Sequence, residues 1–320
     1  MEWRKEVVLK PLAHRYGRHD RISLWGSCFA QELQQHLYTR LYHASFSPFG
    51  IMYNPLSMAE GLGRLLAHRP ELHLLEHEGT WHSLMHHGSY SGTTEDAARA
   101  QMLGAFEEAW RSLPDTRLWV FTFGTAYVYE WGESGTVVNN CHRLPAKYFH
   151  RRRLTVEEIV ATWQPLLTEL RARDAEVLFT VSPIPHYRDG AHESRLSKST
   201  LLLAIDALQG EGIHYFPSYE IQLDELRDYR YFEEDMAHPT PQAVRYILSR
   251  FQDFALEPES DFDRRWAQLL RLAQHRPLTT DPLKIAAHYN TVAQKLATFA
   301  DETSHPYVQE LASQIDKYCR

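Results

Sequence analysis

The chain has 320 residues, 43% hydrophobic and 23% charged, which excludes collagen-like, disordered and disulfide-scaffold classes. Asp and Glu outnumber Lys and Arg by 41 to 34, and the resulting net charge of −7 disfavours nucleic acid as a partner. The three cysteines, Cys28, Cys141 and Cys319, fit a reducing compartment. Residues 1–10 lack the apolar run of a secretory signal, and no apolar segment approaches the roughly 20 residues that span a bilayer. We therefore expect a cytoplasmic protein with no membrane partner.

Short apolar runs bounded by Gly, Pro, Ser or Asp are typical of buried strands. Five such runs occur, at residues 21–25, 43–47, 118–123, 176–181 and 213–216. Segments with helical spacing lie between and after them, for example Phe29, Leu33 and Leu37, or Val244 and Ile247. Strands that alternate with helices predict an α/β fold with a parallel sheet covered on both faces.

The connection between the second and third predicted strands is too long for a simple crossover. This insertion, at about residues 51–115, is expected to hold helices near 56–67 and 95–113 with a His-rich stretch between them. Beyond residue 257 the strand signal stops and the pattern is helical. We therefore predict a domain at 1–257 and a helical extension at 258–320, which either packs on the sheet domain or mediates self-association.

A strand, a turn and a helix follow one another at residues 22–30, and the turn is Gly26-Ser27-Cys28. In a parallel sheet this turn lies at the carboxyl end of the first strand, where α/β proteins usually bind ligands. The unpaired amides and the dipole of a helix start favour both a thiolate and the oxyanion of an acyl intermediate. The structural alternative is that Gly26 makes the turn, Ser27 caps the helix and Cys28 is a small buried hydrophobe.

Asp235 and His238 precede a helix whose start is specified by Thr240 as N-cap and Pro241 as the first helical residue. Their three-residue spacing on a loop lets the carboxylate hold one imidazole nitrogen and leaves the other to face a nucleophile. An isolated Asp-x-x-His is more often a surface loop. This pair falls at the same predicted sheet edge as the Gly26 turn, which favours a shared site.

These two segments, in this order and at this separation, resemble the SGNH hydrolase superfamily, in which a Gly-x-Ser turn follows the first strand and Asp-x-x-His the last. Residues 26–30 spell Gly-Ser-Cys-Phe-Ala, the name of the GSCFA family within it. Other segments similar to that family are 48–50, 53–55, 123–126, 140–142, 182–190, 197–198 and 216–220. The resemblance covers roughly residues 15–255. It implies a three-layer α/β/α sandwich with the flavodoxin-like strand order 2-1-3-4-5 and acyl-ester chemistry.

The sequence departs from the superfamily pattern at the nucleophile. The superfamily uses the third residue of Gly-x-Ser, and the third residue here is Cys28. We therefore favour Cys28 over Ser27, whose side chain leaves the turn in a different direction. Cysteine is an effective nucleophile for acyl transfer when a histidine or a helix end favours its thiolate. The resemblance thus implies a triad of Cys28 or Ser27 with His238 and Asp235.

The sequence also departs at the oxyanion-binding asparagine, because residues 123–126 read Phe-Gly-Thr-Ala where Gly-x-Asn is expected. The oxyanion donors are then expected among backbone amides and two asparagine side chains: Cys28, Gly50, Gly124, Thr125, Asn54 and Asn140. Each such donor contributes roughly 3 kcal/mol of transition-state stabilisation.

Five further residues are expected to contact substrate: His87, His186, Lys198, Tyr219 and Glu220. His87 corresponds to a family position in the long insertion. His186 and Lys198 follow the fourth predicted strand and would bind an anionic or hydroxyl-rich substrate, while Tyr219 and Glu220 follow the fifth. For each residue the alternative is an ordinary hydrogen-bonded or solvated side chain.

The histidine content raises a metal hypothesis. Two pairs have the i, i+4 spacing of ligands on one helical face: His73/His77 and His82/His86. Gly79 and Trp81 interrupt a helix there, and no Cys or carboxylate completes a ligand set, so we expect no metal and no cofactor. The three arginines at 151–153 are expected to be a solvated lead-in to a helix, with a phosphate site as the alternative.

The leading hypothesis is an esterase or O-acyltransferase that acts on a small-molecule or glycan acyl ester through a covalent acyl-enzyme. Water as acceptor gives hydrolysis, and a sugar hydroxyl gives transfer. The rivals are the same fold with Ser27 as nucleophile, a catalytically silent binding or scaffold protein, and a metal enzyme built on the histidines. Cys141 is expected in a loop near the cleft and Cys319 to be inert. Self-association, if present, would use the C-terminal helices.

Overall fold

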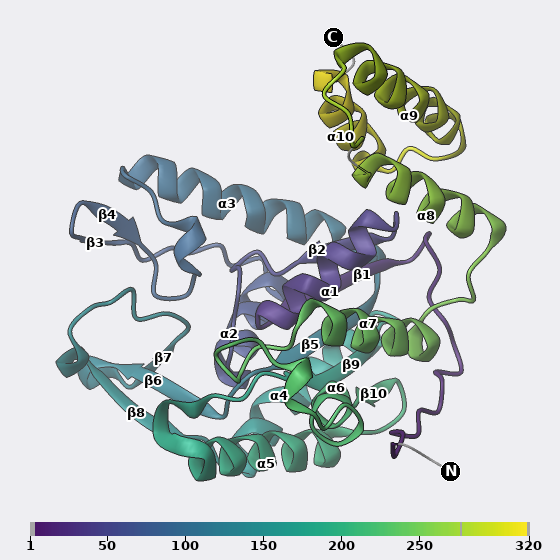
Figure 1. Ribbon diagram of the computed structural model, residues 1–320. Helices are drawn as coiled ribbons and strands as arrows, with labels where there is room; N and C mark the ends of the chain where they lie inside the picture. Colours follow the sequence, from purple (N-terminus) through teal and green to yellow (C-terminus); the bar gives the residue numbers. More distant parts are fainter. Residues whose placement is uncertain (1–3, 276, 319–320) are drawn as a thin grey trace.

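The computed structural model describes residues 4–275 and 277–318, and its centre is a parallel sheet (Figure 1). Its strands are β1 (Arg21–Gly26), β2 (His43–Phe46), β5 (Thr116–Phe123), β9 (Glu176–Val181) and β10 (Ile213–Phe216). They lie in the order β2-β1-β5-β9-β10. The five predicted strands are therefore confirmed, with small differences at their ends, and so is the α/β fold with an all-parallel sheet.

Helices cover both faces of this sheet (Figure 1). One face packs on α1 (Cys28–Thr39) and α7 (Pro241–Ala255), and the other on α2 (Pro55–Leu66), α4 (Val156–Ala172) and α5 (Gly190–Leu208). Alternate strand residues supply the two cores, since Ile22 and Leu24 of β1 pack with α1 while Trp25 packs on the opposite side.

The helices that flank the candidate site form as their sequences predict. Phe29, Leu33 and Leu37 are buried on one side of α1, and each such side chain stabilises the fold by roughly 1.5–3 kcal/mol. Thr240 caps α7 by accepting a hydrogen bond from the Ala243 amide, with Pro241 in the first turn. The cap fixes where the preceding loop must end.

The 51–115 segment contains both predicted helices, α2 and α3 (Glu95–Ser112). Between them the His-rich stretch forms the antiparallel hairpin of β3 (Leu75–His77) and β4 (Thr80–His82). Gly79 supplies the turn with a φ of +75°.

A second antiparallel sheet was not predicted. It consists of β6 (Tyr127–Trp131), β7 (Thr136–Val138) and β8 (Phe149–Arg153), in the order β7-β6-β8. The arginines at 151–153 do precede a helix, α4, but they lie in the strand β8 and are ion-paired, where a solvated segment was predicted. Each is neutralised by carboxylates from elsewhere in the fold: Asp189 for Arg151, Glu130 and Glu158 for Arg152, and Glu193 for Arg153.

The predicted C-terminal helices are α8 (Asp261–Gln274), α9 (Pro282–Glu302) and α10 (Pro306–Ile315), which share a core of their own (Figure 1). They contact the end of α1 that lies far from Cys28. Trp266 Nε1 donates to the carbonyl of Thr39 at 2.8 Å, and His305 Nε2 lies 3.0 Å from the carbonyl of Tyr42. No described helix combines the length and apolar character that a membrane crossing requires.

Candidate active site

The turn after β1 holds Cys28 at the first position of α1. Gly26 has a φ of +139°, and a Cβ there would lie 2.3 Å from the Thr122 carbonyl oxygen on β5, so glycine is required. The amides of Cys28 and Phe29 open the helix and have no preceding helical carbonyl to bond. The helix start thus favours negative charge beside the Cys28 side chain.

Ser27 and Cys28 differ in exposure. Ser27 is 1% exposed and makes no capping hydrogen bond, and its Oγ is buried without a partner among the described residues. Cys28 is a partly exposed free thiol that lines a cavity. Cys28 is therefore the accessible one of the two candidate nucleophiles.

The loop before α7 pairs Asp235 with His238. His238 Nδ1 lies 2.5 Å from Asp235 Oδ2, and Asp235 Oδ1 accepts hydrogen bonds from the amides of Ala237 and His238, each at 2.9 Å. The bond from the His238 amide, then those from its ring and from Ala237, lowers the pKa of Asp235 to about 2. Because Nδ1 is engaged, Nε2 is the nitrogen left for chemistry.

Cys28 and His238 line the same cavity, whose volume is about 430 Å³. Cys28 comes from α1, His238 from the loop before α7, and Ile184 from the loop after β9. All three follow the carboxyl ends of sheet strands. The cavity therefore brings together the thiol and the carboxylate-paired imidazole that the two sequence motifs contain.

Tyr53 is a site residue that the sequence reasoning missed. Its hydroxyl lies 3.6 Å from Cys28 Sγ, within hydrogen-bonding distance for sulfur. Its carbonyl accepts hydrogen bonds from the amides of Gly124 at 2.8 Å and Thr125 at 3.0 Å, which ties the loop after β2 to the loop after β5. The sequence signals for it are its place in the family-like segment 53–55 and its position before a helix start.

The backbone amides predicted to bind an oxyanion are mostly engaged already. The amides of Gly124 and Thr125 donate to the Tyr53 carbonyl, and that of Gly50 donates to the Ser47 carbonyl at 3.0 Å. These three predictions need correction, because each amide closes a contact within or between loops. The backbone amide of Cys28 lies at the start of α1, where the sequence predicted an oxyanion donor.

The two predicted asparagines each make a local hydrogen bond. Asn54 caps α2: its Oδ1 accepts from the Ser57 amide at 2.8 Å and its Nδ2 donates to Ser57 Oγ at 2.9 Å. Asn140 Oδ1 accepts from the His142 amide at 2.9 Å. Neither residue lines the Cys28 cavity. Asn54 is therefore engaged as a helix cap, whereas the donor role of Asn140 stays a prediction.

Lys198 is an internal clamp and not the predicted substrate ligand. It is 2% exposed, and its Nζ donates to the carbonyls of Gly124 and Ser182, each at 2.8 Å. Burial lowers the pKa of Lys198 to about 7. The clamp joins the loops that follow β5 and β9.

Tyr219 and Glu220, in the short helix α6 (Ser218–Glu220), also lie away from the cavity. The Tyr219 ring is buried with Lys198 Nζ 5.4 Å from its centroid, and Glu220 accepts a hydrogen bond from the Tyr215 hydroxyl at 2.7 Å. Tyr219 packs in the core and Glu220 bonds Tyr215, so neither residue is placed in the cavity where substrate contact was predicted.

His186 lies beside Tyr53, with their rings edge to face and 5.9 Å between centroids. Burial, with smaller contributions from the charges of Lys198 and His238, lowers the pKa of His186 to about 4. It is therefore neutral at pH 7. His87 instead caps the turn at Gly88–Tyr90 and does not line the cavity; a Cβ on Gly50 would lie 2.7 Å from its Cβ.

The remaining histidines and the Cys141 thiol have local surroundings of their own. No group of three potential metal ligands occurs among residues 4–275 and 277–318. His82 stacks on His142 with 4.4 Å between centroids, and His86 lies 3.0 Å from Ser83 Oγ. Burial raises the pKa of Cys141 to about 11, and Cys319 lies outside the described residues.

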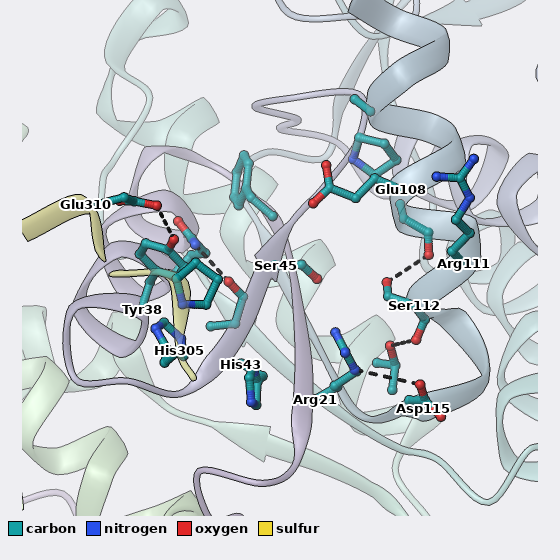
Figure 2. A pocket seen from close by; sticks show the side chains of 18 of the residues that line it. Arg21, Tyr38, His43, Ser45, Glu108, Arg111, Ser112, Asp115, His305 and Glu310 are labelled. Carbon is teal, nitrogen blue, oxygen red and sulfur yellow. Dashed lines mark hydrogen bonds and ion pairs between the residues drawn. The ribbon is translucent and has the colours of Figure 1, made fainter. Parts of the chain in front are cut away.

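A larger cavity of about 710 Å³ lies between β2, α3 and the start of α10 (Figure 2). Two of its charged groups have partners: Arg21 lies 3.8 Å from Asp115, and Tyr38 donates a hydrogen bond to Glu310 at 2.5 Å. It contains none of the predicted site residues. The Cys28 cavity is therefore the candidate active site.

Fold and site together define an α/β protein with a thiol and a carboxylate-paired imidazole at one cavity on the carboxyl side of a parallel sheet. A comparison with protein families matches residues 21–251 to the GSCFA family. The match spans most of the chain, so the protein belongs to the GSCFA family, and the resemblance drawn from the sequence is confirmed. No curated protein matches the chain.

Proposed function

We propose that this protein is an acyl-transfer enzyme of the SGNH hydrolase type, acting on ester bonds as a hydrolase or an O-acyltransferase. The observation that carries the proposal is the shared cavity, which Cys28 and the Asp235-paired His238 line together. Membership of the GSCFA family and the helix cover on both faces of the parallel sheet support it.

In the proposed reaction His238 Nε2 takes the proton of the Cys28 thiol, and the thiolate attacks the ester carbonyl carbon. A sulfur–carbon bond forms and the carbonyl π electrons move to oxygen, next to the start of α1. When the carbonyl re-forms, the carbon–oxygen bond to the leaving group breaks, and His238 returns the proton to that oxygen. Water or a second hydroxyl then takes the acyl group from sulfur by the reverse steps.

The proposed roles of Asp235 and His238 follow from their contacts. Asp235 holds Nδ1 of His238 and stays ionised across the neutral range, because three hydrogen bonds lower its pKa to about 2. It therefore fixes the imidazole tautomer and balances the imidazolium charge. The buried Ser27 is the weaker candidate nucleophile, since substrate would have to displace packed residues to reach it.

The cavity lining favours a linear acyl group with both apolar and polar contacts, because Glu32, Gln35 and Arg245 line the cavity together with apolar side chains. From Cys28 the groove follows α1 as far as Thr39, a length of about 16 Å at the 1.5 Å helical rise. Phe29, Val244 and Leu248 supply apolar lining. The polar acceptor would then lie at the Cys28 end, beside His238.

A silent scaffold would be favoured if His238 lay far from both Cys28 and Ser27, or if the 51–115 segment filled this cavity. Cys28 and His238 line one cavity, and the side-chain hydrogen bond of Cys28 in this structure is to Tyr53. The 51–115 segment is described throughout, and none of its residues lines the cavity. The cavity is therefore open to a ligand.

The test is hydrolysis and transfer of activated esters and thioesters by the full chain, compared with Cys28→Ala and with Cys141→Ala as matched thiol control. We expect ester cleavage by the wild type, its loss by at least about 100-fold in Cys28→Ala, and full retention in Cys141→Ala. A wild type inactive on every ester, or an active Cys28→Ala, contradicts the proposal.

A further inference from the structure

Tyr53 is the described residue whose side chain hydrogen bonds to the Cys28 sulfur, at 3.6 Å from hydroxyl oxygen to Sγ. If a carbonyl carbon bonds to that sulfur, its oxygen lies two bonds away. Oxyanion-hole donors lie about 2.7–3.1 Å from the oxyanion, a distance that a hydroxyl so close to the sulfur can reach.

Of the oxyanion donors that the sequence predicts, the Cys28 amide at the start of α1 remains, and most of the others have partners. The amides of Gly50, Gly124 and Thr125 bond backbone carbonyls, and Asn54 caps α2. No asparagine follows β5 at the position that the resemblance implies, and the Tyr53 phenol stands beside the thiol instead.

Tyr53 is held in place before any substrate arrives. Its carbonyl accepts from Gly124 and Thr125, and its ring packs edge-on against His186. A Cβ on Gly124 would lie 3.1 Å from the Tyr53 carbonyl oxygen and 3.3 Å from its Cδ1, so glycine permits the close approach. A donor fixed in this way needs little reorganisation during the reaction.

The phenol also keeps its proton. Burial, together with the neighbouring Cys28, raises the pKa of Tyr53 above its ordinary value. At neutral pH the hydroxyl is therefore a hydrogen-bond donor and not a base.

We propose that the Tyr53 hydroxyl donates the side-chain hydrogen bond to the oxyanion that forms when the Cys28 thiolate adds to an ester carbonyl. This inference rests on the proposed function. The proton stays on Tyr53 throughout: the bond strengthens as the carbonyl electrons move to oxygen and weakens when the leaving group departs. His238 carries out all proton transfer.

The test compares two reactions of the same thiol in the wild type and in Tyr53→Phe. Acyl transfer from an activated ester forms an oxyanion, whereas alkylation by iodoacetamide displaces iodide from a saturated carbon and forms none. We expect Tyr53→Phe to lower acyl transfer by about 10²–10³-fold and to change alkylation by less than about 3-fold. Tyr90→Phe, at a partly buried tyrosine whose hydroxyl makes no hydrogen bond to Cys28, is the matched control and should leave both rates unchanged.

Each outcome has a distinct meaning. Equal acyl transfer in wild type and Tyr53→Phe overturns the inference and leaves the proposed function intact. An equal fall in both reactions also overturns it, because Tyr53 would then act on the thiol itself or on folding. A wild type that is alkylated at Cys28 but transfers no acyl group refutes the proposed function and this inference with it.

Discussion

Cys28 and His238 line one cavity although they lie near opposite ends of the α/β segment of the sequence. The fold brings them together because α1 and α7 pack on the same face of the sheet and both begin at its carboxyl edge. The Asp235 carboxylate fixes the ring of His238 from the side away from its reactive nitrogen.

Removing the Asp235 carboxylate should impair catalysis without unfolding the protein. Asp235→Asn leaves an amide that no longer holds the Nδ1 proton or balances an imidazolium, so we expect kcat to fall about 10²–10⁴-fold. Steady-state ester hydrolysis measures the effect. The control is Asp228→Asn, which alters an exposed carboxylate paired with Arg230. Equal losses in both variants would contradict the orienting role of Asp235.

The clamp residue Lys198 should make stability depend on pH above neutrality. Its pKa is lowered from 10.5 to about 7 in the folded chain, so between those values the unfolded state binds more protons. The free energy of unfolding should therefore rise with pH from about 7 toward 9 more steeply in the wild type than in Lys198→Met. Urea denaturation at pH 6.5, 8 and 9 measures both slopes. Parallel slopes would show that Lys198 stays charged in the folded chain between pH 6.5 and 9, and would contradict this prediction.

Buried histidines should make the protein sensitive to acid. Burial lowers the pKa of His36 and His186 to about 4 and that of His86 to about 3, all from 6.5. The unfolded state binds more protons in this window, so stability is lost as pH falls from about 6.5 to 4.

His86→Gln tests this loss without touching the candidate site. His86 lies 3.0 Å from Ser83 Oγ and packs on Phe49, and glutamine preserves a polar group that does not titrate. We expect a shallower fall of the free energy of unfolding between pH 6.5 and 4 than in the wild type. An identical fall would assign the acid sensitivity to other groups.

The groove between α1 and α7 should set acyl-chain length. Val244→Trp fills it partway along, so we expect kcat/KM for eight-carbon and longer esters to fall at least about 10-fold, while acetyl esters are spared. Ser249→Trp, on the exposed side of α7, is the matched control. Equal loss for short and long esters in Val244→Trp would show that the acyl group lies elsewhere.

The sequence predicted those parts of the fold and site that depend on local patterns. Apolar runs marked the five strands, and Gly26 and Thr240 marked the turn and the helix cap next to the site. The roles of Tyr53 and Lys198 could not be predicted in this way. Each depends on backbone groups of distant loops, the amides of Gly124 and Thr125 and the carbonyl of Ser182, whose positions exist only after folding.

The same reason explains the strand β8. Three consecutive arginines are typical of a solvated segment. Here they lie in a strand because carboxylates from β6, α4 and the region around the start of α5 neutralise them, and these carboxylates are distant in the sequence. The sequence also predicted more free backbone donors for an oxyanion than the structure contains. A loop amide is a free donor only when no nearby carbonyl accepts its hydrogen bond, and the sequence does not show which carbonyls are nearby.

The most direct test of the central claim is to trap the acyl group on the protein and locate it by peptide mass spectrometry. Full-length wild type, Ser27→Ala and Cys28→Ala are each incubated with an activated ester and quenched in acid. We predict one acyl group on the peptide that contains Cys28 in wild type and in Ser27→Ala, and none in Cys28→Ala. An acyl group at Ser27, or labelling that survives in Cys28→Ala at the wild-type rate, would contradict the assignment of Cys28 as the nucleophile.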